Sequence, residues 1–179
     1  LVAIAIGLRN DYPIRGIVLA SGYYFPNWRW DVWFMSGPAI PLLGDLLRYT
    51  IAPIISWAIL PGAFRKLFAP RPVPGNFKNA FPASLTLRPK QLRAAAEESA
   101  FLVPTAAHFQ SRYRSIRCPV RIFHGTGDKI IEPEQARRLH QLLSSSDLHL
   151  VEDAGHMVTY ADVFAITTVA DTAGAIADP

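Results

Sequence analysis

The sequence contains a single cysteine, Cys118, among its 179 residues. One thiol cannot form a disulfide within the chain, and it cannot supply a zinc site built from several cysteines. The five histidines lie at 108, 124, 140, 149 and 156, so no two of them have the spacing of a helical zinc-binding pair. A glycine-rich phosphate loop is also missing from the sequence. We therefore predict neither a metal site nor a cofactor.

Charged residues are scarce as well, at 18% of the chain, whereas 50% of the residues are hydrophobic. The 18 basic and 14 acidic residues leave a formal net charge of +4. The basic residues form small clusters, at 65–71 and 112–117, and not the dense stripe that a nucleic-acid-binding surface needs. This pattern predicts a globular protein with an ordinary solvated surface and no nucleic-acid partner.

The longest apolar run, 49–60, has only twelve residues and is interrupted by Pro53. A helix that crosses a membrane needs about twenty residues. The run therefore predicts a helix that is buried or lines a pocket. A helix that lies in a membrane interface and meets a lipid substrate is the alternative.

Residues 118–160 contain a strand, a helix and a second strand in order. The first strand, 120–124, is rich in β-forming residues and stops at a glycine-rich turn. Pro133 begins a segment in which apolar residues recur at three- and four-residue spacing, as on one face of a helix. The second strand covers 148–151. A right-handed crossover would place both strands parallel in one sheet.

Asp128 follows the first strand and His156 follows the second, so both are expected at the carboxyl edge of the sheet, where α/β folds place their chemistry. The intrinsic pKa of histidine suits a general base. An aspartate can orient that base and stabilise the imidazolium that forms. Glu152 and Asp153 are competing acids, but Asp128 is preferred because it follows the end of a strand.

At these residues the chain resembles the α/β-hydrolase family. The sequence HGTGD at 124–128 resembles the family's acid-bearing turn, and EDAGH at 152–156 resembles its histidine turn. The resemblance implies a nucleophile upstream of Asp128 in a G-x-S-x-G elbow. That pattern is missing from the 179 residues. Ser21 lies at a predicted strand end but lacks the elbow's first glycine, so we interpret it as a sheet-end or pocket residue.

The start of the chain offers an explanation for the missing elbow. An apolar segment at 1–8 precedes a predicted buried strand at 14–20. In the family that the chain resembles, a helix and a strand of this kind directly follow the elbow. We therefore expect a C-terminal piece of a longer hydrolase. The predicted fold class is α/β, the C-terminal part of an α/β-hydrolase parallel sheet with a mostly helical cap insertion.

The predicted hydrolase core comprises 1–22 and 116–179, and the predicted cap or lid comprises 23–115. Ten of the fifteen prolines lie at 38–104, within this insertion, which also contains all four tryptophans. Short helices are expected in the insertion. The proline-rich segment 69–90 is expected to be an extended or irregular connector. The expected helices cover 28–35, 39–50, 53–60, 88–99 and 104–114.

The densest aromatic patch begins the insertion, and it predicts an apolar substrate pocket formed by Tyr23, Tyr24, Trp30, Trp33 and Phe34. Packing of the cap onto the sheet is the competing interpretation. Three functions stay open. They are a serine-dependent hydrolase of apolar acyl esters, an aspartate-nucleophile hydrolase of epoxides or carbon–halogen bonds, and a ligand-binding module without catalysis. The sequence does not indicate the oligomeric state.

Overall fold

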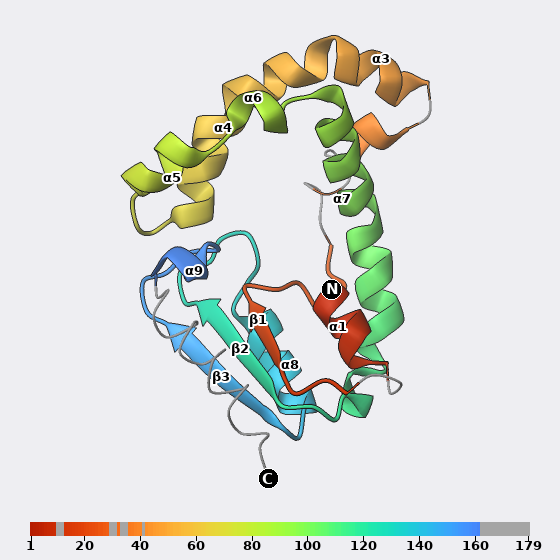
Figure 1. Cartoon of the computed structure of the whole chain (residues 1–179), viewed down its shortest axis with the longest axis vertical. Coiled ribbons are helices and arrows are strands. Elements are labelled where there is room, and N and C mark those ends of the chain that lie inside the picture. The colour runs from red at the N-terminus through yellow and green to blue at the C-terminus, as the bar shows by residue number, and fades with distance from the viewer. Residues whose placement is uncertain (10–12, 29–31, 33–35, 41, 162–179) are drawn as a thin grey trace. The chain divides into compact units, whose positions relative to one another are not determined.

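The computed structural model describes residues 1–9, 13–28, 32, 36–40 and 42–161 (Figure 1). The chain divides into two compact units. The first, here called the core unit, comprises Leu1–Phe25, Lys66–Pro72 and Ala106–Pro179. The second, the helical unit, comprises Pro26–Arg65 and Val73–Thr105. Residues 23–25, 66–72 and 106–115 therefore belong to the core unit, although the sequence predicted them as part of the cap.

Three parallel strands form the sheet of the core unit: β1 (Ile17–Ala20), β2 (Val120–Gly125) and β3 (Ser146–Val151). They are arranged in the order β1-β2-β3, with Ile17 paired to Val120 and Val120 paired to Ser146. The predicted α/β fold with parallel strands is confirmed. Because the strands are parallel, the loops that follow them share one edge of the sheet.

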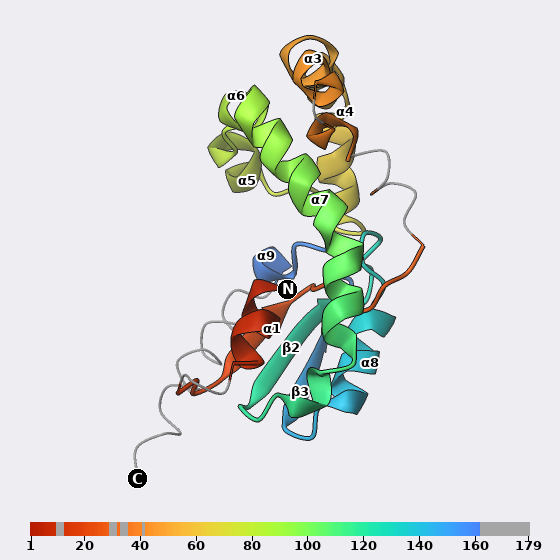
Figure 2. The same ribbon diagram turned by 90° about the vertical axis from the view of Figure 1, so that its right-hand side faces the viewer.

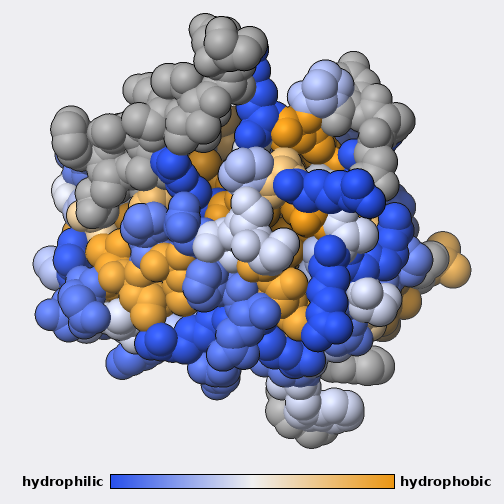
Figure 3. All heavy atoms as spheres, turned by 90° about the horizontal axis from the view of Figure 1, so that it is seen from below, coloured by the Kyte–Doolittle hydropathy of each residue, from blue (hydrophilic) through white to orange (hydrophobic). Residues whose placement is uncertain are grey.

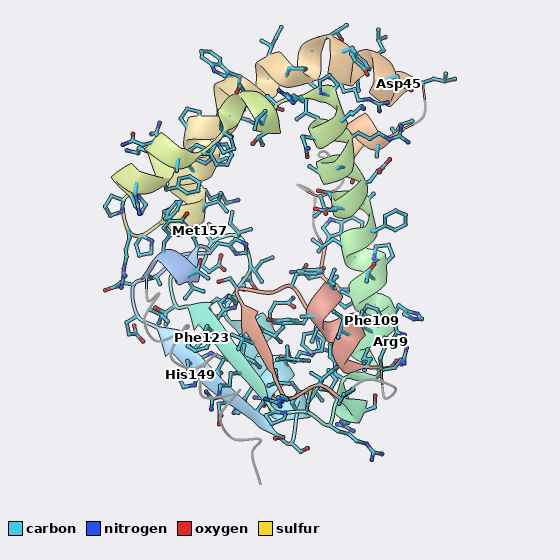
Figure 4. The ribbon with its side chains drawn as sticks, viewed as in Figure 1. Arg9, Asp45, Phe109, Phe123, His149 and Met157 are labelled. Atoms are coloured by element: carbon cyan, nitrogen blue, oxygen red, sulfur yellow. The ribbon has the colours of Figure 1, made fainter. Side chains whose placement is uncertain are left out.

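Alternate residues of the strands pack on opposite faces of the sheet. On one face, the side chains of β1 and β2 form a core with α1 (Val2–Gly7), with α8 (Glu134–Leu142) and with the turn η2 (Tyr113–Ser115) (Figure 2). On the other face, Phe123 packs with Ala154 and with Val158 of α9 (Val158–Ala161). Phe123 also stacks on His149 of β3, with ring centroids 4.8 Å apart (Figure 4).

Helix α8 fixes the loop that follows β1. The Oε1 atom of Gln135 accepts the backbone N–H groups of Tyr24 and Phe25, at 2.9 and 2.7 Å, and its Nε2 donates to the Phe25 carbonyl at 2.9 Å. The guanidinium of Arg138 lies 3.9 Å from the centre of the Phe25 ring. Buried backbone groups need such partners, so the side chain of Gln135 determines the path of the chain beyond β1.

The insertion is mostly helical, as expected, but two details of the prediction are wrong. The connector at 69–90 contains two short helices, because Pro74 and Pro82 are at positions that begin a helix. The helices predicted at 88–99 and 104–114 are one helix that continues through Pro104. The elements are η1 (Gly37–Ala39), α3 (Leu43–Tyr49), α4 (Ile51–Phe68), α5 (Gly75–Ala80), α6 (Ala83–Thr86) and α7 (Pro89–Gln110).

An aromatic cluster stabilises the helical unit. The ring of Phe64, from α4, lies 5.0 Å from the ring of Phe77 and 4.7 Å from the ring of Phe81 in edge-to-face contacts. Phe77 and Phe81 lie 5.4 Å apart. Such pairs stabilise a fold by about 0.5–1.5 kcal/mol each beyond the burial of their area. They join α4 to the segment that contains α5.

Helix α4 has 18 residues and is longer than the run predicted at 49–60. By length and composition alone it could cross a membrane, but one such helix is weak evidence because core helices meet the same criteria. Its Ile54 and Trp57 side chains are exposed within the described part of the chain. Figure 3 views the molecule from below relative to Figure 1, and on that face hydrophobic patches lie among hydrophilic residues.

Candidate active site

The turn after β2 holds Asp128 against the end of β3. Thr126 donates its backbone N–H to the Val151 carbonyl at 3.0 Å, and Gly127 donates to Ala154 at 2.9 Å. A Cβ atom at Gly125 would lie 2.5 Å from the Gly155 carbonyl oxygen, closer than real Cβ atoms approach other atoms. The two loops that carry Asp128 and His156 therefore touch through their backbones, and glycine permits that approach.

The loop that carries His156 connects β3 to α9 and packs on a segment that is distant in sequence. A Cβ atom at Gly155 would meet the carbonyl oxygen of Leu67 and the carbonyl carbon of Phe68, each at 2.8 Å. Met157, the next residue after the histidine, donates its backbone N–H to Leu67 at 3.2 Å. Arg71 donates to the Glu152 carbonyl at 2.9 Å. The histidine loop is thus fixed on both sides.

The structure brings Asp128 and His156 together. The Nδ1 atom of His156 lies 2.8 Å from the Oδ2 atom of Asp128. The carboxylate is fully buried, whereas the imidazole side chain is 24% exposed. A carboxylate only accepts hydrogen bonds, so Nδ1 carries a proton, and in the neutral ring Nε2 keeps its lone pair. This tautomer is the one that a general base requires, with Nε2 free to accept a proton.

Asp128 accepts further hydrogen bonds. Its Oδ1 accepts the backbone N–H groups of Ile130 and Ile131 at 2.8 and 3.0 Å. Burial by itself raises the pKa of Asp128, but hydrogen bonds from His124, His156 and Ile131 outweigh that effect and hold the pKa well below its usual range. The carboxylate therefore stays ionised over the whole range of physiological pH.

The competing acids lie elsewhere. The carboxylate of Glu152 accepts the hydroxyl of Thr126 at 3.3 Å. Asp153 has a φ of 52° and donates its backbone N–H to the same hydroxyl at 3.1 Å, so it forms the turn before the histidine. Among the acids of the described chain that the sequence analysis compared, Asp128 is the one in contact with the His156 ring. Asp162, the next acid after the histidine turn in the sequence, lies outside the described residues.

The sequence matches the family model described as the alpha/beta hydrolase family over residues 1–166. The chain belongs to the α/β-hydrolase family. No curated protein matches it. The esterase from Exiguobacterium antarcticum has a similar structure, with a TM-score of 0.69 and 15% sequence identity. That match covers 97% of this chain and 62% of the esterase.

Two other solved structures extend the comparison. An alpha/beta hydrolase fold protein from Burkholderia ambifaria has a TM-score of 0.70 and 18% identity, and the enol-lactonase from Burkholderia xenovorans LB400 has a TM-score of 0.51 and 18% identity. Each match covers 94% of this chain and 60% of the other protein. Identities this low show the shared fold alone. The chain spans about three fifths of the length of these hydrolases.

The aromatic residues predicted to bind substrate are only partly described. Tyr23 and Tyr24 are buried, at 5% and 1% exposure, and Tyr24 packs in the core beside β1. Trp30, Trp33 and Phe34 lie outside the described residues. A role of these five residues in substrate binding stays a prediction for this family member.

Ser21, next after β1, is 6% exposed and has a φ of 46°. Its backbone N–H donates to the Phe123 carbonyl at 2.9 Å, so it extends the pairing of β1 with β2. Its hydroxyl has no hydrogen-bond partner among the described residues. A sheet-end position agrees with our interpretation of this serine.

His124 is the residue of the site that the sequence analysis missed. It is fully buried in β2, and its Nε2 lies 3.3 Å from Asp128 Oδ2. The signal was present in the sequence, because His124 begins the HGTGD turn at four residues from the acid. Across the described chain, no group of three potential metal ligands is placed to hold an ion.

Proposed function

We propose that Asp128 and His156 are the orienting acid and the general base of a serine-dependent hydrolase that cleaves esters of apolar acyl groups. The observation that carries the proposal is the hydrogen bond of 2.8 Å between His156 Nδ1 and the buried Asp128 carboxylate. The nucleophile belongs to residues of the protein outside these 179, because no elbow motif occurs among them.

The chemistry follows from the tautomer of His156. A serine hydroxyl is a weak nucleophile at neutral pH, so a base must take its proton as it attacks the ester carbonyl. His156 Nε2 takes that proton, and the Asp128 carboxylate stabilises the imidazolium. The imidazolium then protonates the departing alkoxide, which leaves an acyl-enzyme. Water, deprotonated by the same nitrogen, cleaves the acyl-enzyme and regenerates the serine.

The choice of an ester substrate is supported by the similar solved structures. These include esterases from Exiguobacterium antarcticum and Thermogutta terrifontis and an enol-lactonase from Burkholderia xenovorans LB400. The apolar acyl group is suggested by the aromatic residues at 23–34.

The test uses the full-length protein and two reagents. We expect turnover of p-nitrophenyl esters and covalent labelling of one serine by a fluorophosphonate, with both lost in a His156→Ala variant. Turnover of an epoxide or haloalkane without fluorophosphonate labelling would instead indicate an aspartate nucleophile. A folded protein that turns over none of these substrates but binds an apolar ligand would support the non-catalytic alternative.

A further inference from the structure

A second histidine contacts the acid of the proposed pair. His124 is 0% exposed and lies next to the last residue of β2. Its Nε2 atom is 2.9 Å from the carbonyl oxygen of Ile131 and 3.3 Å from Asp128 Oδ2. The mechanism above assigns it no role. A polar side chain that is completely buried against an ionised carboxylate therefore needs an explanation.

The surroundings of the ring determine its protonation. Both atoms near Nε2 are acceptors, so Nε2 carries a proton. The other ring nitrogen, Nδ1, is buried and has no hydrogen-bond partner among the described residues. A second proton there would leave a charged donor unpaired in the interior, which is more costly than an unpaired lone pair. His124 is therefore a neutral imidazole with its proton on Nε2.

Four donors then surround the carboxylate of Asp128. Oδ1 accepts two backbone N–H groups, from Ile130 and Ile131, and Oδ2 accepts the N–H of His156. The Nε2–H of His124 is shared between the Ile131 carbonyl at 2.9 Å and Oδ2 at 3.3 Å. Two carboxylate oxygens offer about four lone-pair positions. With these four donors around it, the carboxyl group cannot rotate without losing contacts, and the lone pair directed at His156 stays in place.

His124 also closes a ring of hydrogen bonds. Its Nε2 lies 2.9 Å from the Ile131 carbonyl, while the N–H of Ile131 donates to Asp128 Oδ1 at 3.0 Å. The turn from Asp128 to Ile131 is thus held at both of its ends by His124 of β2. Among the described residues, the titratable side chains in contact with Asp128 are His124 from β2 and His156 from the loop after β3.

We propose that His124 is a positioning residue, whose neutral Nε2–H fixes the Asp128 carboxylate in the orientation that receives His156. This inference rests on the proposed function. Loss of the Nε2–H leaves the buried, ionised carboxylate with one donor fewer to fix its orientation. The base is then oriented less well, so turnover falls while binding of the substrate is unaffected.

The test compares two variants of the full-length protein. Glutamine places an N–H donor close to the position of the histidine Nε2, whereas phenylalanine fills the volume without a donor. We expect His124→Phe to lower kcat about 10- to 100-fold, as for one lost hydrogen bond to a charged group. KM should stay unchanged. The acid limb of the pH profile should move to higher pH, because the Asp128 carboxylate has lost a donor that favours its ionised form. His124→Gln should stay within about threefold of the parent, since it keeps the donor.

A matched control is His149→Phe, which removes an exposed histidine from the neighbouring strand β3 and should leave kcat unchanged. The proposal is overturned if folded His124→Phe keeps the parent kcat and pH profile, or if His124→Gln loses as much activity as His124→Phe. Folding of each variant is checked by its circular dichroism spectrum and thermal unfolding.

Nuclear magnetic resonance provides readouts that need no activity. The nitrogen shifts of the His124 ring should report a neutral ring with its proton on Nε2. An imidazolium, or a proton on Nδ1, would contradict the proposal even if His124→Phe fails to fold. In folded His124→Phe, the carboxyl carbon of Asp128 should titrate at higher pH than in the parent. If the parent has no ester turnover, the proposed function fails, and these spectra still decide whether His124 holds Asp128.

Discussion

Met157 donates its backbone N–H to the carbonyl oxygen of Leu67 at 3.2 Å, across ninety residues of sequence. This bond joins the loop of His156 to the segment in which α4 ends. The ring of Phe68 adds an edge-to-face contact with Tyr160 of α9, at 5.5 Å. The position of the base therefore depends on residues that the sequence analysis had assigned to the cap.

The close packing at Gly155 leads to the first prediction. A methyl group there would overlap the backbone atoms of Leu67 and Phe68, which cannot move aside as a flexible side chain can. We expect Gly155→Ala to lower the free energy of unfolding by about 1–3 kcal/mol, the usual cost of overpacking. Urea denaturation measures the change.

Gly7→Ala is the control for that substitution. Gly7 also lies in the core unit, but its added Cβ would meet the terminal carbon of the Ile17 side chain, which can rotate. The loss of stability should therefore be smaller than for Gly155→Ala. Equal losses of stability would show that the contact with Leu67 and Phe68 is not what makes alanine unfavourable at Gly155.

Asp128 and His156 should behave as one unit in the full-length protein. His156→Ala removes the base, and Asp128→Asn favours the wrong tautomer, an effect of roughly 10⁴ in kcat in a serine protease. Each change should lower kcat by orders of magnitude, and KM should move little. The double variant should be scarcely worse than His156→Ala alone, because members of such a unit are not additive. Losses that multiply, or a larger effect of Asp153→Asn, would show that the acid is assigned wrongly.

The polypeptide 1–179 by itself should show no ester hydrolysis. It contains His156 and Asp128 but no elbow motif, and one oxyanion donor of the fold belongs to the residue after the nucleophile. Steady-state release of p-nitrophenol should equal that of its His156→Ala variant. Faster turnover by the unsubstituted polypeptide would mean that a residue within this chain, with Ser21 as the first candidate, acts as nucleophile.

The depressed pKa of Asp128 predicts how stability changes with pH. Because the pKa is lower in the folded than in the unfolded protein, this carboxylate stabilises the fold above about pH 4, the unfolded value. The contribution is lost as the pH falls below about 4. In Asp128→Asn the free energy of unfolding should fall less steeply with acid than in the parent. Urea denaturation over a pH series tests this, with Glu152→Gln as an exposed control; parallel curves for parent and Asp128→Asn would contradict it.

Substitutions in the aromatic patch test the predicted pocket. If Trp30, Trp33 and Phe34 contact the acyl group, cutting one of them to alanine in the full-length protein should change the preference among ester chain lengths. If they only pack the cap, the variant should lose about 3–5 kcal/mol of stability with the preference unchanged. Kinetics with a series of p-nitrophenyl esters, together with thermal unfolding, separates the two results.

The sequence by itself determined the strand-helix-strand order of 118–160 and the edge of the sheet that carries the pair. Local patterns are sufficient for this, because β-forming residues, glycine turns and helical spacing act within a few residues. Asp128 and His156 follow successive parallel strands, and parallel strands bring their carboxyl ends together. Their contact could therefore be predicted without coordinates.

Only the tertiary structure showed which other residues support the pair. In the sequence, His124 cannot be told from any other buried strand residue. In the folded chain, the turn after β2 places Asp128 Oδ2 3.3 Å from the His124 Nε2 atom. Arg71 lies in the proline-rich segment 69–90 that the sequence predicts as a connector, yet Arg71 and Leu67 hold the histidine loop. Such contacts join residues that are far apart in sequence and depend on packing and backbone geometry. No local propensity encodes them, so the folded chain alone decides how firmly His156 is held.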